Sequence, residues 1–406
     1  MSKVSTAEFG LLEAENAHAS GGVQRRAGVV IIRGEGIRLF DDRGNAYVDC
    51  GSAHGWANLG HNHPDVTRAI QEQAKQLVAL TESAYNDQRA AWLEELANLF
   101  TREIGSSERG ALCRILPCNS GAEAIEAAIK VSRLFTGRSQ FVAFRRGFHG
   151  RTLGALSATA NLKFRQPFEP LVPGFTHVPF NDIDRLDRVV NDSVAGVLVE
   201  TVQGEGGVHP ATDEFLRALR SVCTARGALL IVDEIQTGFG RTGRWFACQH
   251  SGVAPDIIAM GKSLGGGIPM GAIAWRSDLG TIPSGSHGST FGGGPLACAA
   301  SRAMLDALDR GNVIEDAARL GQLAQDYLEA FDAFIVRDVR GLGLMIGVEV
   351  KTRVGPLLKR LMERGVWALP AGLNVLRIMP PLIIKEAELQ SVLQIIGDTL
   401  LEGDRA

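Results

Sequence analysis

The sequence predicts an α/β fold, with a mostly parallel sheet between layers of helices and a smaller α+β domain after it. Between about residues 64 and 300, short apolar runs alternate with segments of helical apolar spacing, as strands and crossover helices do in a parallel sheet. After about residue 306 the pattern changes to a helix, paired strands, and then helix, strand and helix. The 406 residues suffice for more than one core.

The individual elements follow from apolar spacing and turn residues. Strands of the large sheet are expected at 140–144, 196–201, 228–234, 256–262 and 271–275, and helices at 89–100 and 121–135. Residues 28–50 are expected to form short strands that glycine-bearing turns separate. The C-terminal part is expected to contain helices at 313–331 and 355–365, strands within 334–350 and 374–384, and a last helix from Glu386.

These patterns suggest three parts. Residues 1–63 are an N-terminal segment that contributes to the small domain, residues 64–305 are the large domain, and residues 306–406 are the C-terminal small α+β domain. Proline and glycine are spread along the chain, so the boundaries are soft.

Composition excludes several classes of protein. The net charge is −3 and Lys and Arg are scattered, which argues against a nucleic-acid partner. No apolar run approaches the length of a membrane span, and the first residues have no apolar secretory segment. The six cysteines show neither a CxxC pair nor zinc spacing. We therefore expect a cytoplasmic protein with reduced thiols, without a metal site and without membrane attachment.

The stretch "ALLIVDEIQTGFGRTG" places carboxylates at the end of an apolar run. Residues 228–232 are typical of a strand buried on both faces, and Asp233 and Glu234 follow directly. A charge at such a position costs several kcal/mol unless it is paired. Ligands of open α/β sheets bind at the carboxyl ends of the strands. We therefore expect a positive partner opposite Asp233.

A second candidate site is the start of the helix in "PCNSGAEAIEAAIK", residues 117–130. The backbone N–H groups of Gly121 and Ala122 would be unsatisfied and at the positive end of the helix dipole, which suits a phosphate. Simple capping of the helix by Ser120 is the alternative.

A third candidate is Lys262, in "IIAMGKSLGGGIPMG", residues 257–271. It follows an apolar run and precedes glycines, so it is expected at a sheet end, where a partly dry lysine can form a Schiff base. An ordinary exposed lysine is the alternative. A phosphate loop is excluded because Asp256 stands where its first glycine is required. The Gly-x-Gly in residues 339–350 precedes a strand, so a nicotinamide dehydrogenase is not indicated.

One ligand satisfies all three candidates. It has a phosphate for the helix start, an aldehyde for Lys262 and a protonated ring nitrogen for Asp233. Pyridoxal phosphate has these groups, and a lysine Schiff base with an aspartate at the ring nitrogen is its usual arrangement.

The sequence also resembles the class III, fold type I pyridoxal-phosphate aminotransferases over nearly its whole length. The strings that carry this resemblance are "DCGSAHGWANLGHNHP", "NSGAEAIEAAIK", "GFHGRT", "QGEGG", "DEIQTGFGRTG", "GKSLGGGIPMG", "HGSTFGGGPLA" and "LRIMPPL". Within the family it looks most similar to acetylornithine aminotransferases and to enzymes acting on carrier-protein-linked lysine or ornithine. The strings "GEGGVHPATDEFLRA" and "ALPAGLNVLRIMPPLII" suggest the latter.

The resemblance implies roles for residues around the cofactor. Lys262 and Asp233 are the catalytic pair, Phe148 stacks on the ring and Gln236 lies near the ring hydroxyl. Thr290 reaches the phosphate of the neighbouring subunit, which implies a homodimer with a shared active site. The implied cofactor-binding set is Ser120, Gly121, Ala122, Phe148, Asp233, Glu234, Ile235, Gln236, Lys262 and Thr290. In one departure, Ile125 stands where many relatives have Asn.

For the substrate, the resemblance implies that Arg151 clamps a carboxylate, with Ser289 nearby. Glu205 and Arg377 resemble a gating pair, although a permanent structural ion pair is the alternative. His54 stands where some relatives carry an aromatic residue that helps to hold the substrate's α-carboxylate. His54 is either part of the donor pocket or a satisfied surface histidine.

The implied reaction moves the terminal amino group of an N-acylated ornithine or lysine, either N-acetyl- or carrier-protein-linked, to 2-oxoglutarate. The products are a semialdehyde and glutamate, in lysine or arginine biosynthesis. Alternatives within the fold are a 4-aminobutyrate- or ornithine-type ω-transaminase and a glutamate-1-semialdehyde-type aminomutase. An inactive homologue or a cofactor-binding regulator is a different class, against which Lys262 and Asp233 argue. Whether an amino-group carrier protein delivers the donor stays open.

Overall fold

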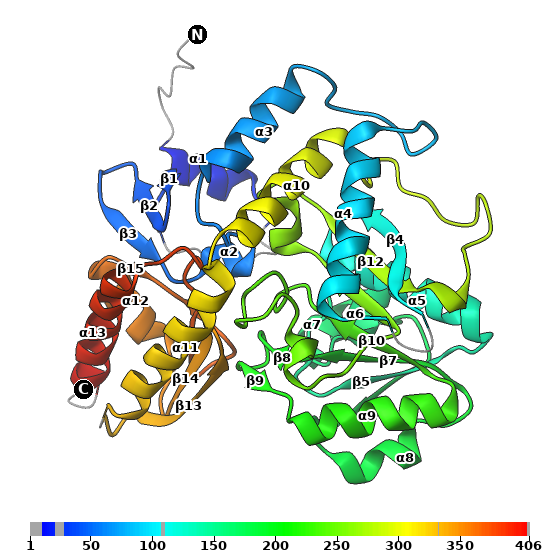
Figure 1. Ribbon diagram of the computed structural model, residues 1–406. Helices are drawn as coiled ribbons and strands as arrows, with labels where there is room; N and C mark the ends of the chain where they lie inside the picture. The colour runs from blue at the N-terminus through cyan, green and yellow to red at the C-terminus, as the bar shows by residue number, and fades with distance from the viewer. Residues whose placement is uncertain (1–9, 21–27, 107–109, 332, 404–406) are drawn as a thin grey trace.

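The computed structural model describes residues 10–20, 28–106, 110–331 and 333–403. Within them, the largest sheet has seven strands in the order β4-β12-β11-β10-β7-β5-β6 (Figure 1). Its strands are β4 (Leu112–Cys118), β5 (Gln140–Phe144), β6 (Phe175–Val178), β7 (Val194–Glu200), β10 (Leu229–Asp233), β11 (Ile257–Met260) and β12 (Gly271–Arg276). From β11 to β6 the neighbouring strands are parallel, whereas β12 is antiparallel to both β11 and β4. The prediction of a mostly parallel sheet between helices is confirmed.

The central strands are buried on both faces, as their unbroken apolar sequences require. Successive side chains of β10 enter different cores: Leu230 packs in the cluster that contains residues of α4 (Asp87–Glu103) and α9 (Asp213–Arg226). Ile231 packs in the cluster that contains residues of α5 (Gly121–Thr136). Helices on both faces leave only the strand ends as a place for polar chemistry.

Two strands of the large sheet were missing from the sequence prediction, β4 and β6. Both are edge strands in the described part of the chain. An edge strand tolerates polar residues and proline, because one side of its backbone needs no partner. Arg114 and Pro117 interrupt the apolar run of β4, which is why apolar spacing did not reveal it.

The C-terminal part contains a second sheet, in the order β13-β14-β17-β16. Its helices lie beside it, with α11 and α13 adjacent and the long α10 leading in from the large sheet (Figure 1). The elements are α10 (Pro295–Arg310), α11 (Val313–Glu329), β13 (Val336–Leu342), β14 (Met345–Val350), α12 (Gly355–Glu363), β15 (Val366–Trp367), β16 (Leu369–Pro370), β17 (Val375–Ile378) and α13 (Glu386–Gly403). The prediction of mixed helices and strands in this part is confirmed.

The N-terminal strands join this C-terminal part. Strands β1 (Ile31–Glu35), β2 (Arg38–Asp41) and β3 (Ala46–Asp49) form a sheet with β15, in which Val366 pairs with Val48. The three-part division of the chain itself stays a prediction.

The remaining elements are short or lie at the surface. They are α1 (Leu11–His18), α2 (Ser52–Gly55), α3 (Pro64–Ala74), α6 (Leu153–Ala158), α7 (Leu162–Arg165), α8 (Leu186–Val189), β8 (Val202–Gln203) and β9 (His209–Pro210), with 3-10 turns at Gln166–Phe168, Ile183–Arg185, Ala247–His250, Lys262–Gly265 and Ser277–Leu279. Every helix in the described residues is too short or too polar to cross a bilayer.

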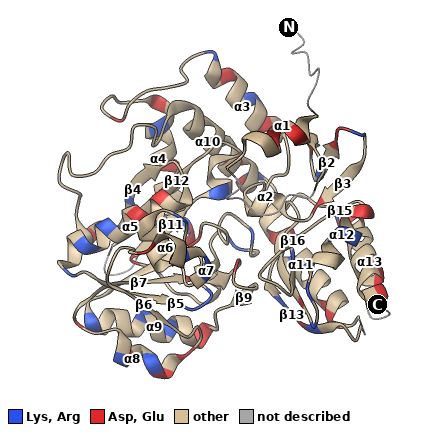
Figure 2. Cartoon of the chain, turned by 180° about the vertical axis from the view of Figure 1, so that it is seen from behind, with Lys and Arg blue, Asp and Glu red and all other residues tan. Residues whose placement is uncertain are grey.

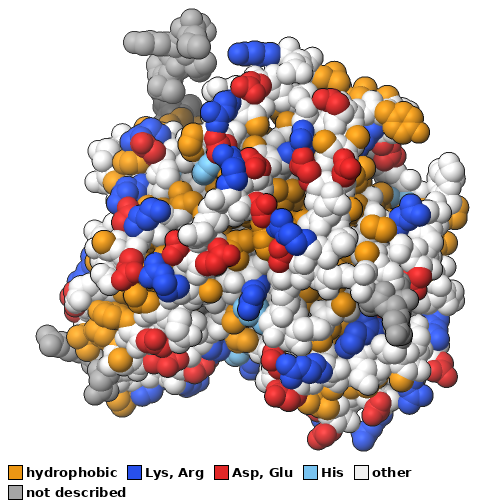
Figure 3. Space-filling model, viewed as in Figure 1, with side chains coloured by type: hydrophobic (Ala, Val, Ile, Leu, Met, Phe, Trp, Pro, Cys, Tyr) orange, Lys and Arg blue, Asp and Glu red, His pale blue; other side chains and the backbone are white. Residues whose placement is uncertain are grey.

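Lys and Arg are interspersed with Asp and Glu in the views of Figures 2 and 3.

A buried arginine connects the parts of the molecule. Arg241 follows β10 in the sequence and is completely buried. Its Nη1 donates to the carbonyl oxygens of Leu344 (3.1 Å) and Pro380 (2.6 Å), and its Nη2 donates to Asn58 Oδ1 (2.7 Å). These bonds hold the N-terminal segment and the C-terminal sheet against the loop that follows β10, beside the candidate site.

Candidate active site

A cavity of about 180 Å³ lies where β7, β10 and β11 end. Asp233 is the last residue of β10, Glu200 is the last of β7, and Lys262 comes two residues after β11. The cavity is lined by Gly121, Ala122, Phe148, His149, Gly150, Glu200, Val202, Glu205, Asp233, Ile235, Gln236, Thr237 and Lys262. Residues that are far apart in the sequence therefore meet at the strand ends, where open α/β sheets bind ligands.

Asp233 has a partner that the sequence analysis missed. Its Oδ2 lies 2.7 Å from His149 Nδ1, and its Oδ1 accepts the Ile235 N–H at 3.0 Å. Burial by itself would lower the pKa of His149, but the hydrogen bond to Asp233 and the charges of Asp233 and Glu200 outweigh burial and raise it. His149 is thus a buried hydrogen-bond partner that holds the Asp233 carboxylate in place. Its position in "GFHGRT" was the available sequence signal.

Glu200 is a second buried carboxyl group that the sequence analysis missed. Its Oε2 accepts the Phe148 N–H at 3.0 Å. Burial, only partly offset by the charge of His149, raises the pKa of Glu200 to about 8. Near neutral pH, Glu200 is therefore mostly protonated.

Lys262 faces the same cavity and is half-buried, so it is not an ordinary exposed lysine. Its backbone is left-handed, with φ at 49°, which a non-glycine residue adopts only when its surroundings enforce it. Burial lowers the pKa of Lys262 to about 8, with Arg377 acting in the same direction and Glu205 opposing it. An amine with this pKa is partly uncharged near neutral pH and is a competent nucleophile and base.

The start of α5 forms another wall of the cavity. The Ser120 side chain caps the helix by accepting the Glu123 N–H at 3.2 Å, while Gly121 and Ala122 line the cavity. A Cβ on Gly121 would lie 2.9 Å from Ile235 Cγ2, so only glycine lets the helix approach this closely. The positive end of the α5 dipole therefore faces the cavity and can hold an anion.

Other predicted cofactor neighbours are divided between the cavity and the core. Phe148, Ile235 and Gln236 line the cavity. Glu234 does not: its carboxylate accepts hydrogen bonds from Thr237 Oγ1 (2.5 Å) and the Cys248 N–H (2.9 Å), and it is completely buried. Burial raises the pKa of Glu234 to about 7. Its hydrogen bonds to Thr237 and Cys248 brace the loop after β10.

The predicted gating residues lie together. Arg377, from β17, is completely buried, and its Nη1 donates to Glu205 Oε1 at 2.6 Å. Arg377 Nη2 lies 3.2 Å from His54 Nδ1. Burial would raise the pKa of Glu205, but the charge of Arg377 lowers it well below its usual range. Because Glu205 lines the cavity, its ion pair connects the buried arginine with the candidate site.

The remaining predicted substrate and phosphate contacts lie outside the cavity lining. Arg151 is exposed, with its guanidinium 4.2 Å from the Phe164 ring centre. Ser289 Oγ accepts from Asn119 Nδ2 at 3.0 Å, so it lies beside the start of α5. Thr290 is exposed.

Ile125, the departure in α5, is completely buried between this helix and the sheet. It therefore packs in the core and does not line the cavity.

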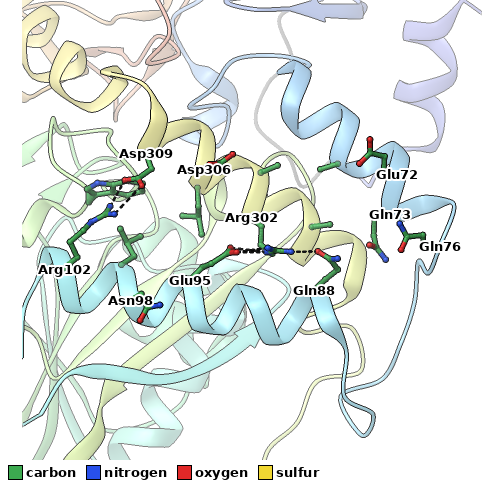
Figure 4. Close-up of a pocket in the computed structure, with 16 residues that line it drawn as sticks. Glu72, Gln73, Gln76, Gln88, Glu95, Asn98, Arg102, Arg302, Asp306 and Asp309 are labelled. Carbon is green, nitrogen blue, oxygen red and sulfur yellow. Dashed lines mark hydrogen bonds and ion pairs between the residues drawn. The ribbon is translucent and has the colours of Figure 1, made fainter.

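A larger groove of about 720 Å³ lies elsewhere, between α3, α4 and α10 (Figure 4). Four of its charged side chains pair with one another across the groove: Arg302 with Glu95 at 2.7 Å and Arg102 with Asp309 at 2.7 Å. Neither Lys262 nor Asp233 lines it. The chemistry therefore belongs to the smaller cavity.

The smaller cavity suits pyridoxal phosphate. It combines the positive end of a helix for a phosphate, a lysine of lowered pKa for an aldehyde, and a buried carboxylate for a ring nitrogen. Residues 20–400 match the family described as Aminotransferase class-III. The chain belongs to the class III aminotransferases. Pyridoxal phosphate is the cofactor of this family, and the chain is accordingly a pyridoxal-phosphate-dependent transaminase.

Individual relatives of this aminotransferase agree with the family. It is 44% identical over 385 residues to a [LysW]-aminoadipate semialdehyde transaminase from Deinococcus radiodurans, covering 94% of this chain and 88% of the relative. It is also 44% identical to an acetylornithine aminotransferase from Methanopyrus kandleri, covering 92% and 94%. The crystal structure of ornithine aminotransferase from Toxoplasma gondii is similar with a TM-score of 0.91 at 31% identity, covering 97% and 95%. The predicted fold type I architecture is confirmed.

Proposed function

We propose that this aminotransferase moves the terminal amino group of an N-acylated ornithine or lysine to 2-oxoglutarate, in arginine or lysine biosynthesis. The observation that carries the proposal is the Glu205–Arg377 ion pair at the cavity that holds Lys262. The names of the two 44% identical relatives support the donor class. The proposed acyl group is either acetyl or a carrier protein, because the first of these relatives is named for a [LysW]-linked substrate.

The residues of the cavity divide the work of the reaction. Pyridoxal phosphate, when bound, supplies the electron sink for a substrate carbon that loses a proton. Lys262 removes that proton and returns it, which its lowered pKa permits near neutral pH. Asp233, fixed by His149 and the Ile235 N–H, keeps a negative charge where the ring nitrogen needs a proton. Phe148 adds an apolar wall.

The Glu205–Arg377 pair lets one cavity accept two kinds of substrate. The donor brings an apolar chain and a terminal amine, so the charge of Arg377 is best neutralised by Glu205 in the donor half-reaction. Glutamate brings an α-carboxylate, which the guanidinium fork can bind once Glu205 moves aside. Arg151 holds the donor's carboxylate, which lies far from its terminal amine, in the first case and the side-chain carboxylate of glutamate in the second.

Single-turnover kinetics of the two half-reactions test this exchange. Glu205→Ala should favour the glutamate half-reaction over the donor half-reaction, because Arg377 is left uncovered. Arg377→Ala should slow mainly the glutamate half-reaction, by about 10-fold or more, since a charge-assisted two-point contact is lost. Equal losses in both half-reactions for both variants would show that the pair is only structural.

A donor panel tests the proposed substrate class. N-acetylornithine, N-acetyl-lysine, carrier-linked lysine, ornithine and 4-aminobutyrate are compared as donors to 2-oxoglutarate by kcat/KM. We expect the N-acylated compounds to lead, and the preference between acetyl and carrier-linked forms decides whether a carrier protein is a partner. Preference for free ornithine or 4-aminobutyrate would contradict the proposal and identify an ω-transaminase of that type. Isomerisation of glutamate-1-semialdehyde without net amino transfer would identify an aminomutase.

The active site is proposed to be shared between two copies of the chain. Tyr85 and Phe291 are large, exposed side chains on two loops, which the Ser289 N–H bond to Glu82 Oε1 (3.2 Å) holds together. The loops lead directly into α4 and α10, which border the groove in Figure 4. Exposed apolar side chains of this kind support an interface here, and a second copy seated on them would carry Thr290 to its neighbour's cavity.

Mixing two inactive variants tests the shared site. Lys262→Ala removes the reactive lysine of a copy's own site, and Thr290→Asp damages the site of its neighbour. In a mixed dimer, one of the two sites then has both an intact Lys262 and an intact Thr290. Random exchange of subunits should therefore restore up to about a quarter of the wild-type activity. No recovery after exchange confirmed by mass spectrometry, or a fully active monomer in light scattering, would contradict the proposal.

A cytoplasmic location is part of the proposal. All six cysteines are free, and five of them are buried. Buried free thiols suit a reducing compartment.

A further inference from the structure

The segment that carries His54 has an unusual backbone. Ser52, Ala53 and His54 are consecutive left-handed residues, with φ at 40°, 48° and 61°. Non-glycine residues adopt such angles only when their surroundings enforce them. Here the Ser52 hydroxyl donates to the Met379 carbonyl at 2.6 Å, and Gln236 Nε2 donates to the His54 carbonyl at 2.9 Å. The turn is thus fixed between the end of β17 and the cavity wall, and α2 lies at the centre of the molecule (Figure 1).

The His54 imidazole is directed at Arg377. Its Nδ1 lies 3.2 Å from Arg377 Nη2 and 3.7 Å from Glu205 Oε1. A guanidinium has only donors, so the contact with Arg377 is a hydrogen bond in the tautomer whose Nδ1 accepts and whose proton lies on Nε2. In this arrangement His54 is neutral.

Arg377 depends on few partners. Its Nη1 bonds to Glu205 and its Nη2 to His54, while its buried Nε has no hydrogen-bond partner in the described residues. Glu205 uses one carboxylate oxygen in this pair. If Glu205 moves away to admit a substrate carboxylate, the contact with His54 stays and holds the Arg377 guanidinium in place.

We propose that His54 is a positioning residue, which holds the Arg377 guanidinium ready for a substrate carboxylate while Glu205 moves aside. The inference rests on the proposed exchange between Glu205 and the substrate. A neutral acceptor suits this task, because it orients the guanidinium without cancelling its charge. A second carboxylate at this position would compete with the substrate for the same fork. This role contrasts with the alternative of a satisfied surface histidine, which would leave glutarate binding unchanged when the side chain is removed.

Three substitutions of His54 distinguish the effect of its hydrogen-bond acceptor from the effects of side-chain charge and of backbone conformation. His54→Asn keeps a neutral acceptor, His54→Asp adds a negative charge to the same shape, and His54→Gly removes the side chain. Asn, Asp and Gly all tolerate a left-handed backbone, so strain does not separate them. Binding of glutarate, an unreactive dicarboxylate, is measured by calorimetry on the holoenzyme. Thermal unfolding confirms that each variant is folded.

His54→Asn is expected to bind glutarate within about 3-fold of wild type, whereas His54→Gly and His54→Asp should each weaken it by about 10-fold or more. The donor half-reaction should change by less than about 3-fold in all three variants, since Glu205 then covers Arg377. Wild-type affinity in His54→Gly, or equal losses in His54→Asn and His54→Gly, would overturn the inference. Equal losses in both half-reactions would show a merely structural role. If the pattern appears but no N-acylated donor reacts, the proposed donor class fails and the inference stands.

Discussion

Replacing Lys262 with Ala is expected to abolish multiple turnover while leaving the fold intact. One side chain both anchors the cofactor and transfers the proton, and proton transfer alone contributes about 100- to 10,000-fold. Because both roles are lost together, we expect a fall in kcat of at least about 10,000-fold. Steady-state assays with N-acetylornithine measure the effect, and circular dichroism confirms the fold.

Lys163→Ala is the matched control, since Lys163 lies exposed in α7. It should retain wild-type activity. Turnover near the wild-type rate in Lys262→Ala would rule out this lysine as the reactive amine.

The second large effect is expected for Asp233→Asn, which keeps the shape of the side chain but removes its charge. Without that charge the ring nitrogen of the cofactor is not held protonated, and His149 loses the partner that raises its pKa. We expect kcat to fall by about 100- to 1,000-fold, as for other preorganised electrostatic groups. A fall of less than 10-fold would contradict the role assigned to Asp233.

The adjacent carboxyl group supplies the control for this variant. Glu234→Gln changes a buried residue that bonds to Thr237 and Cys248 and does not line the cavity. It should lower the thermal stability, with kcat changed by less than about 3-fold. Loss of activity in Glu234→Gln equal to that in Asp233→Asn would show that the experiment reports disturbance of the loop and not the charge of Asp233.

The sequence predicts most of the fold because burial on two faces leaves a clear pattern. The run before Asp233 in β10 is apolar throughout, since Leu230 and Ile231 enter cores on opposite faces of the sheet. Edge strands have no such requirement, and β4 and β6 were therefore missed. The chain order of helices and strands also does not show that β15 pairs with β3, because that contact joins residues more than 300 positions apart.

The sequence predicts those parts of the candidate site in which a residue type and its position indicate a specific chemical role. Lys262, Asp233 and the start of α5 carry such signals, and the structure brings all three to one cavity. His149 and Glu200 were missed, because their roles come from a contact with Asp233 and from burial, which spacing does not reveal. Glu234 shows the reverse: it is adjacent to Asp233 in the sequence, yet its carboxylate is directed to the core.

The role of Lys262 as the cofactor's anchor is tested most directly by reduction of the purified holoenzyme with borohydride, followed by peptide mass analysis. Reduction makes the bond between the cofactor and its lysine permanent, so the modified residue identifies the reactive amine. We expect one pyridoxyl-phosphate group per chain, on the peptide that contains Lys262, and loss of that group when N-acetylornithine is added before reduction. A group on another lysine, or no group at all on a folded, cofactor-loaded protein, would contradict this role.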